Sequence, residues 1–194
     1  GNSLSDLIVL GKIAGESAAS RAAEMNGFTD IPEEEIASAI SETLAPLSRE
    51  GGENPAAVVE DLREMMQEKV GIIRTGKLLQ EALKDLDELE ARAALTCPGG
   101  SRIYNPGWHQ ALELGAMIDV SRMCALAALE REESRGGHTR DDFPIPDHSH
   151  WGKVNSVISL SGDGSMKIEH RSYPPIDEEF KALLDADDLH EEEA

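Results

Sequence analysis

The stretch NPGWHQALELGAMIDVSRMCALAALEREE, residues 105–133, decides the fold expected for this chain. Asn105 suits the N-cap of a helix, and Pro106 suits its first helical position. Residues 114–129 are apolar almost all round the expected helix. The exceptions are Asp119, Ser121 and Arg122. Because a helix of this kind is buried on most sides, we expect 107–133 to be the most buried and central member of a helical bundle.

Two amphipathic helices are expected upstream of this stretch. Asn54 and Pro55 open the first, which carries an apolar stripe with helical spacing. Its members are Val58, Leu62, Met65, Met66 and Val70. The second helix runs from about residue 77 to 95, with Leu79, Ala82, Leu83, Leu86 and Leu89 on one face. A Cys-Pro-Gly-Gly break at 97–100 ends it. Three long helices with short connections form an antiparallel up-down bundle.

The fold class is therefore mainly α: a spectrin-repeat-like three-helix bundle with extra helices before it and a small β-hairpin after it. Ser3 or Ser5 caps the first helix and Gly27 ends it, while Pro32 starts the second helix and Pro46 ends it. Beyond residue 138 the apolar period changes to that of a hairpin, with a turn at 161–165. The expected divisions are 1–27, 28–53, 54–138, 139–184 (loop, hairpin and short helix) and an acidic disordered tail at 185–194.

Composition excludes several functions. The 194 residues carry 38 acidic and 18 basic side chains, a formal net charge of -20. Nucleic-acid binding needs clustered Lys and Arg, so this charge argues against it and against an anionic membrane surface. No apolar run approaches the roughly 20 residues of a membrane span. Cys97 and Cys124 show neither metal-ligand spacing nor a disulfide framework, which favours a reducing compartment.

The first residues form a second informative motif. Asn2-Ser3-Leu4 is followed by Asp6, a four-residue apolar run and Gly11-Lys12. A helix beginning here presents unpaired backbone N–H groups and a partial positive charge, which stabilise an electron-rich group. The small residues further along permit close approach of a flat surface, but taken alone they favour an ordinary Ala-rich helix packed in a core. They are Gly11, Gly15, Ala18 and Ala22.

A third motif follows the long helix. Glu-Ser-Arg-Gly-Gly-His at 133–138 leads into Arg140, two acidic residues and Phe-Pro at 143–144, with Asp147 and Trp151 further on. Upstream pieces of the same pattern are Gly71, Arg74, Thr75, Leu112-Glu113-Leu114 and Ile118-Asp119. Together with the N-terminal motif, this pattern resembles the C-terminal portion of the succinate dehydrogenase and fumarate reductase flavoprotein subunits. Gly137 departs from the more usual Ala, and His148 and His150 stand where polar or acidic residues are usual.

The resemblance implies a function for a larger protein. It implies interconversion of succinate and fumarate with FAD, and transfer of electrons to an iron–sulfur subunit and then quinone. It also implies a peripheral location on the cytoplasmic side of the bacterial inner membrane, where an anchor subunit is contacted indirectly and nothing inserts directly. The catalytic and dinucleotide-binding residues of the family lie upstream, so the chain is expected to start in the middle of a longer protein, to hold no catalytic residue and to bind no FAD alone.

The resemblance also assigns roles to four residues. Ser3 and Leu4 lie against the flavin ring in the family. Arg135 and His138 are expected to dock the bundle onto the upstream flavin domain, because Arg offers a planar fork of donors and His a switchable one. The alternative for Arg135 and His138 is a helix C-cap that only satisfies the last carbonyls.

Other interpretations stay open. An L-aspartate oxidase C-terminal domain or a free-standing helical interaction module would share much of the helical pattern. Asp147, His148 and His150, with Asp141 and Asp142 nearby, could hold a metal ion, but a solvated loop is favoured. We therefore expect no metal site. His109, beside Trp108, is expected to be a surface residue at a helix start.

Overall fold

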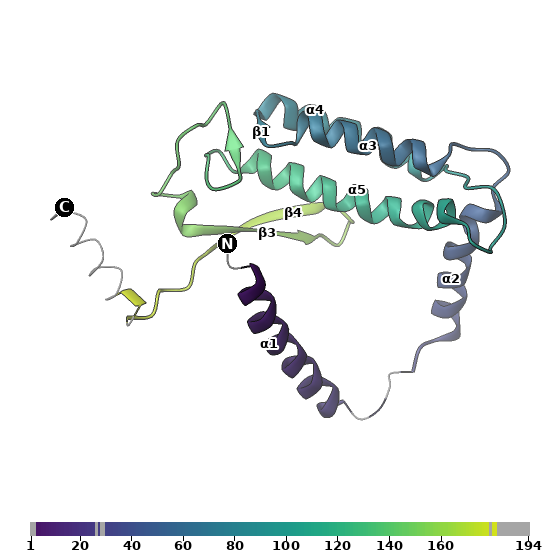
Figure 1. The fold of residues 1–194 in the computed structure, drawn as a ribbon, viewed down its shortest axis with the longest axis horizontal. Coiled ribbons are helices and arrows are strands. Elements are labelled where there is room, and N and C mark those ends of the chain that lie inside the picture. Colours follow the sequence, from purple (N-terminus) through teal and green to yellow (C-terminus); the bar gives the residue numbers. More distant parts are fainter. Residues whose placement is uncertain (1–2, 26, 28–29, 179, 182–194) are drawn as a thin grey trace. The chain divides into compact units, whose positions relative to one another are not determined.

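A computed structural model describes residues 3–25, 27, 30–178 and 180–181. The chain divides into two compact units, Gly1–Thr43 and Leu44–Ala194. Figure 1 shows the order of the elements, and each unit is described here by itself. The predicted acidic tail at 185–194 lies outside the described residues. Of the short helix expected before residue 184, the described residues show helical backbone only at 178 and 180–181.

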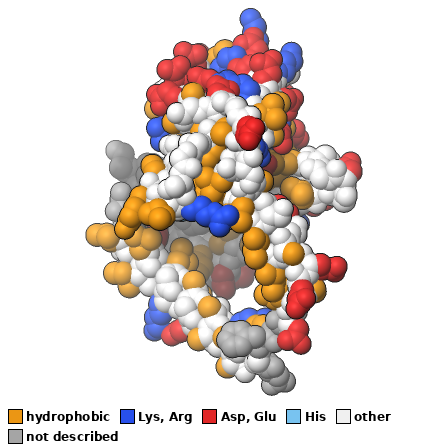
Figure 2. All heavy atoms as spheres, turned by 90° about the vertical axis from the view of Figure 1, so that its right-hand side faces the viewer, with side chains coloured by type: hydrophobic (Ala, Val, Ile, Leu, Met, Phe, Trp, Pro, Cys, Tyr) orange, Lys and Arg blue, Asp and Glu red, His pale blue; other side chains and the backbone are white. Residues whose placement is uncertain are grey.

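The first unit contains α1 (Ser3–Glu24) and most of α2 (Glu33–Leu44). Pro46 lies in the 3-10 turn η1 (Ala45–Ser48), which follows α2 directly, so the predicted end of this helix is confirmed. The large apolar side chains of α1 are exposed, Leu4 to 76% and Ile8 to 74%. Exposed hydrophobic side chains are visible in orange in Figure 2. In the described part of this unit, no side chain is buried.

The second unit is built on the predicted three-helix bundle. Its helices are α3 (Pro55–Lys69), α4 (Gly76–Ala93) and α5 (Pro106–Glu130), and each packs against the other two. The core they share is almost purely aliphatic. Its members are Val58, Val59, Leu62, Met65, Val70, Leu79, Ala82, Leu86, Leu89, Leu114, Ile118, Ala125 and Ala128. The predicted fold class is confirmed, and so are the predicted stripes of α3 and α4, except that Met66 and Leu83 are only half-buried.

Side-chain caps fix where the three helices begin. The Asn54 side chain accepts a hydrogen bond from Ala56 N (3.0 Å), and Pro55 opens α3 as predicted. Thr75 caps α4 by accepting from Leu78 N (3.2 Å), and Asn105 caps α5 by accepting from Trp108 N (3.1 Å). Each cap satisfies one of the N–H groups that a helix start leaves without an internal partner.

The burial predicted for α5 is wrong. Leu114 and Ile118 are buried, but Leu112 and Val120 are 39% and 58% exposed, and Ala116 and Cys124 are exposed on the same face. The helix meets α3 and α4 on one side and contacts the hairpin at few positions. Within the described part of the second unit, nothing covers the remaining stripe. The apolar composition of α5 therefore exceeds what this bundle buries.

The C-terminal hairpin has the predicted form. Strands β3 (Val154–Leu160) and β4 (Met166–Ser172) pair antiparallel, with Ile158 opposite Ile168. Gly164, at φ +84°, supplies the left-handed backbone in the turn at 161–165. A short 3-10 turn, η2 (Trp151–Lys153), precedes β3.

A second, very short sheet joins distant parts of the chain. Strand β1 (Ile73–Arg74) pairs in parallel with β2 (Thr139–Arg140), which the sequence did not indicate. In the described residues, no helix is long and apolar enough to cross a membrane.

Candidate docking site at the end of helix α5

Arg135 and His138 face each other across a tight turn. Arg135 N donates to His138 O (2.8 Å), and His138 N donates to Arg135 O (3.0 Å). Gly136, at φ +57°, supplies the left-handed backbone that such a turn needs. The predicted stop of the helix by glycine is therefore only partly right, because α5 ends at Glu130 and the glycines turn the chain six residues later.

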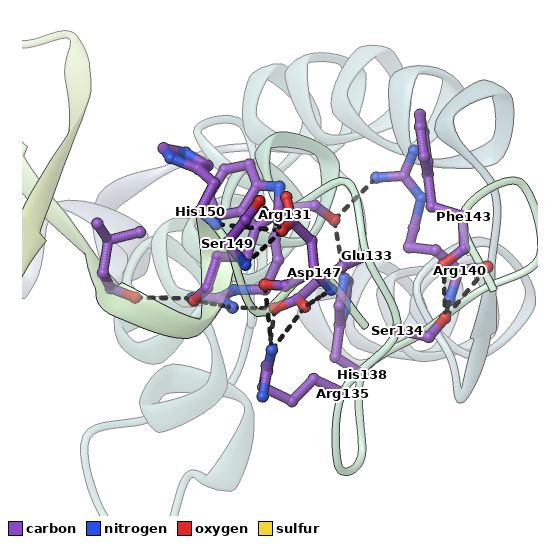
Figure 3. A network of polar contacts seen from close by, with 12 residues as sticks. Arg131, Glu133, Ser134, Arg135, His138, Arg140, Phe143, Asp147, Ser149 and His150 are labelled. Carbon is purple, nitrogen blue, oxygen red and sulfur yellow. Dashed lines mark hydrogen bonds and ion pairs between the residues drawn. The ribbon is translucent and has the colours of Figure 1, made fainter. Parts of the chain in front are cut away.

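A buried carboxylate, Glu133, lies at the centre of the site (Figure 3). The Arg135 guanidinium donates to both of its oxygens, from Nε to Oε1 (2.9 Å) and from Nη2 to Oε2 (3.0 Å). Asp147 N donates to Oε2 (2.7 Å), and Arg131 Nη1 donates to Oε1. Burial works to raise the pKa of Glu133, but the hydrogen bonds from Arg135, Asp147 N and Arg131 outweigh burial and lower it. The carboxylate is therefore ionised and fully paired.

His138 is held in one tautomer by its two neighbours. Arg74 Nη1 lies 2.8 Å from Nδ1, and because arginine can only donate, Nδ1 accepts. Nε2 therefore carries the proton and donates to Arg131 O (3.0 Å). Burial and the nearby Arg74, Arg140 and Arg131 cations lower the pKa of His138. The imidazole is neutral at pH 7, so the switchable donor expected from the sequence is locked in its neutral form.

The sequence motif contains Arg140 but did not indicate its role in the site. It is almost completely buried, and its Nη1 donates to the carbonyls of Ala128 and Leu129 (both 2.9 Å), in the last turn of α5. Its other nitrogens hold Asp142 through a two-pronged pair, Nε to Oδ1 (2.8 Å) and Nη2 to Oδ2 (2.9 Å). The Arg140 hydrogen bond and charge lower the pKa of Asp142 far below its ordinary range. The helix cap is therefore made by Arg140, with His138 on the carbonyl of Arg131, and not by Arg135.

Asp142 extends this contact to another helix. Its Oδ2 accepts from Gly76 N (2.8 Å), the first residue of α4. A Cβ at Gly76 would lie 3.1 Å from both Arg140 Nη2 and Asp142 Oδ2, so this glycine allows the close approach. A basic residue in the last turn of a helix stabilises the helix C-terminus and can be recognised in a sequence. Arg140 lies ten positions beyond the end of α5, however, and only folding of the loop brings it back.

The loop around the two predicted histidines is ordered by Asp147. Asp147 Oδ1 accepts from Ser149 N (2.7 Å), Ser149 Oγ (2.6 Å) and His150 N (3.1 Å), and these bonds lower the pKa of Asp147. The His150 ring contacts Trp151 edge-on, with centroids 4.7 Å apart, and Trp151 contacts His170 in the same way at 4.8 Å. Among the described residues, no group of three or more His, Cys, Asp or Glu is placed to hold a metal ion.

The two residues expected at the flavin lie at the start of α1. Leu4 is exposed, and the side chain of Ser3 and all of Asn2 lie outside what the structure describes. Their proposed contact with a flavin ring therefore stays a prediction. His109 is exposed near the start of α5, as expected for a surface position.

The charged groups of this site are paired with one another. The carboxylates of Glu133 and Asp142 are both held by arginine forks, and His138 is neutral with both ring nitrogens bonded. The network locks the loop that follows α5 onto the ends of α4 and α5.

Comparison with known proteins identifies the family. A sequence model described as "Fumarate reductase flavoprotein C-term" matches residues 59–181. The chain therefore belongs to the succinate dehydrogenase and fumarate reductase flavoprotein family, and it corresponds to the C-terminal portion of those subunits.

Individual relatives agree with this assignment. The chain is 36% identical to the fumarate reductase flavoprotein subunit of Helicobacter pylori over 78% of its length, and 30% identical to that of Escherichia coli over 98%. It spans only 22% and 33% of those subunits, respectively. The structure of the Mycobacterium smegmatis Sdh1 complex in the apo form matches 90% of the chain and 30% of its own, with 38% identity and a TM-score of 0.84. These matches do not favour an L-aspartate oxidase or a free-standing interaction module.

Proposed function

We propose that this chain acts as the C-terminal domain of a flavoprotein subunit that interconverts succinate and fumarate. The family match over residues 59–181 carries this proposal. Oxidation of succinate removes a hydride and a proton and reduces FAD, which an upstream domain would bind. The electrons would then pass to an iron–sulfur subunit and on to quinone. Because the chain spans a third or less of its relatives, the activity belongs to the larger subunit.

Within that subunit, the chain would position and support the catalytic domain. Ser3 and Leu4 would form part of the wall beside the flavin. Arg135 would contact the flavin domain, since its side chain is about one-third exposed and its Nη1 makes no hydrogen bond to the described residues. His138 would act indirectly, by holding the turn and Arg131 in place.

The assembled enzyme would be peripheral to the membrane. The relatives are fumarate reductase flavoprotein subunits, and a solved relative belongs to the Sdh1 complex. We therefore place the subunit on the cytoplasmic side of the bacterial inner membrane, attached through its partner subunits and without direct insertion.

The test uses the complete reading frame. The gene upstream of Gly1 should encode a Gly-x-Gly-x-x-Gly motif between a strand and a helix, the signature of dinucleotide binding. The complete subunit should purify with bound flavin and oxidise succinate with an artificial acceptor. A start codon directly before Gly1, or a complete subunit that holds flavin but is inert toward both succinate and fumarate, contradicts the proposal.

A further inference from the structure

The His138 side chain connects the end of α3 to the end of α5. On one side, its Nδ1 accepts from Arg74 Nη1 (2.8 Å). The Nε of the same arginine donates to Val70 O (3.0 Å) and Gly71 O (2.7 Å), just beyond the last residue of α3. On the other side, Nε2 of His138 donates to Arg131 O (3.0 Å), just beyond α5. The imidazole is therefore a bridge between two helix ends, and each ring nitrogen has one role in it.

This bridge lies beside the short parallel sheet. Arg74 belongs to β1, and His138 directly precedes β2, whose Arg140 is paired with Arg74. The Asp141 N–H, just after β2, donates to Arg74 O (2.9 Å). A sheet of two strands, each two residues long, has little stability of its own. The contact between the His138 and Arg74 side chains is therefore an important part of what holds segments 73–74 and 139–141 together.

The surroundings of His138 are positively charged. Three cations from separate segments of the chain face the imidazole: Arg74 in β1, Arg140 in β2 and Arg131 after α5. The nearby carboxylates, Glu133 and Asp142, are both held by arginine, and neither is bonded to the imidazole. A proton on Nδ1 would add a fourth positive charge and would replace an acceptor by a donor that faces the Arg74 donor. Both changes oppose the closed arrangement.

We propose that His138 is an acid-sensitive latch. While its ring is neutral, it accepts from Arg74 and holds β1 against β2. When Nδ1 takes up a proton, the contact with Arg74 is lost, and segments 73–74 and 139–141 separate while the helical core stays folded.

The direction of the pH dependence follows from the closed state. Burial and the three cations lower the pKa of His138 there, whereas the open state leaves the imidazole free to titrate near its ordinary value of about 6.5. The proton therefore binds the open state more tightly. The latch stays closed at neutral pH, and opening becomes more frequent as the pH falls below about 6.5.

Opening of the latch also reaches the turn that carries Arg135. The backbone groups of Arg135 and His138 bond to each other in both directions. Movement of His138 away from Arg74 therefore displaces the side chain proposed to contact the flavin domain. This consequence for docking rests on the proposed function, whereas the latch itself is a property of the chain.

Hydrogen exchange in the 194-residue chain, followed by NMR, tests the latch. The reporter is the Asp141 N–H, and the reference is the Leu86 N–H in the buried middle of α4. Each exchange rate is compared with the intrinsic rate at the same pH. Uptake of one proton on opening should lower the protection of Asp141 about tenfold between about pH 7.5 and 5.5. Because the opening is local, Asp141 should exchange faster than Leu86, and low urea concentrations should accelerate only Leu86.

Two variants assign the effect to one histidine. His138→Asn keeps an acceptor toward Arg74 but cannot take up the proton, so the acid dependence of Asp141 exchange should disappear. His170→Asn is the matched control, because His170 lies at the same end of α5, where it contacts Trp151 and Glu130. It should leave that dependence unchanged.

Three results would overturn the latch. The first is exchange of Asp141 only together with Leu86, with the same protection and the same response to urea. The second is constant protection of Asp141 while the His138 ring resonances of the same sample titrate. The third is an undiminished acid dependence in His138→Asn. The first two come from the parent chain, so they decide the question even where the variant does not fold.

Flavin retention by the complete subunit tests the consequence for docking separately. Transfer from about pH 8 to about pH 5.5 should release flavin from the parent subunit, and His138→Asn should release less. Equal release from both, with the latch observed by exchange, overturns the coupling to Arg135 and leaves the latch supported. A complete subunit that binds no flavin even at about pH 8 contradicts the proposed function alone, because the latch is measured without flavin.

Discussion

Arg140 and Asp142 form a two-pronged ion pair that fastens the end of α5 to the start of α4. The Nε–Oδ1 and Nη2–Oδ2 distances are 2.8 and 2.9 Å. Arg140 reaches the last carbonyls of α5 with its third nitrogen, and Asp142 accepts from Gly76 N. Because the arginine is almost completely buried, the pair is screened from solvent on that side.

Removal of Arg140 should be strongly destabilising. Arg140→Ala leaves two helix carbonyls and the Asp142 carboxylate without their partner, and breaking such a buried pair costs roughly 3–5 kcal/mol. Arg140→Lys should recover only part of this loss, because lysine has no planar fork. Urea denaturation measures both. The control is Arg63→Ala, an exposed residue whose ion pair contributes at most about 1 kcal/mol. Equal effects of Arg140→Ala and Arg63→Ala would show that the cap is unimportant.

Acid should destabilise the fold in two ranges of pH. The pKa of His138 is lowered in the folded chain. As the pH falls, the unfolded chain therefore becomes protonated at this histidine at a higher pH than the folded chain does. The free energy of unfolding then falls as pH drops below about 6.5, the ordinary histidine value. Glu133 and Asp142 also have lowered pKa values. Their contribution is present above the unfolded carboxyl pKa of about 4 and is lost as pH falls below it.

Two variants separate these ranges. His138→Asn should lose the decline below pH 6.5 and keep the one near pH 4, whereas Asp142→Asn should weaken only the second. Urea denaturation at about pH 8, 6.5, 5.5, 4 and 3 provides the comparison, and differences between variants remove the contribution of the large net charge. A His138→Asn variant with the same decline as the parent between pH 7 and 5.5 would contradict the assignment of a neutral, buried imidazole.

The core of the bundle can be tested at α5. Leu114→Ala should cost on the order of 2–5 kcal/mol, because its side chain is fully buried among the three helices. Leu126→Ala should cost less, since Leu126 is half-buried. Val120→Ala, on the exposed face, should change stability by no more than about 0.5 kcal/mol. A thermal shift near zero for both leucine variants would contradict the bundle.

Docking through Arg135 can be separated from its contribution to folding. Arg135→Ala removes one of the two arginines on Glu133, and so does Arg131→Ala. Both should lower the stability of the chain, but only Arg135→Ala should lower flavin retention in the complete subunit. If the two variants lose flavin equally at matched stability, Arg135 is only a partner for the buried carboxylate.

The chain on its own should be catalytically silent. Hydride transfer needs a flavin held in a pocket beside the substrate, and we propose only Ser3 and Leu4 of this chain for that pocket. The purified chain should be colourless, should bind no FAD at micromolar concentration and should not reduce an acceptor with succinate. The complete subunit is the positive control. A flavin absorbance spectrum from the chain alone would mean that the cofactor-binding residues have been misplaced.

Local sequence signals determined most of the secondary structure. Asn54-Pro55 and Asn105-Pro106 begin α3 and α5, and a turn at 161–165 joins the two strands of the hairpin, as predicted. These signals are readable because a cap or a tight turn depends on residues within four positions of one another. The apolar stripes of α3 and α4 were readable for the same reason.

Burial on α5 and the roles around Glu133 were decided by the tertiary structure. Composition alone could not tell that Val120 lies on an uncovered face, because burial depends on which elements pack beside a helix. The sequence singled out Arg135 and His138 within a motif, but it gave no sign that Arg140 caps α5 or that Asp142 meets Gly76, 66 positions away. Sequence by itself thus determined the helices, the hairpin and the family resemblance. The pairing of charges between distant segments was decided only when the loop folded back, since a buried ion pair forms where the chain brings its members together.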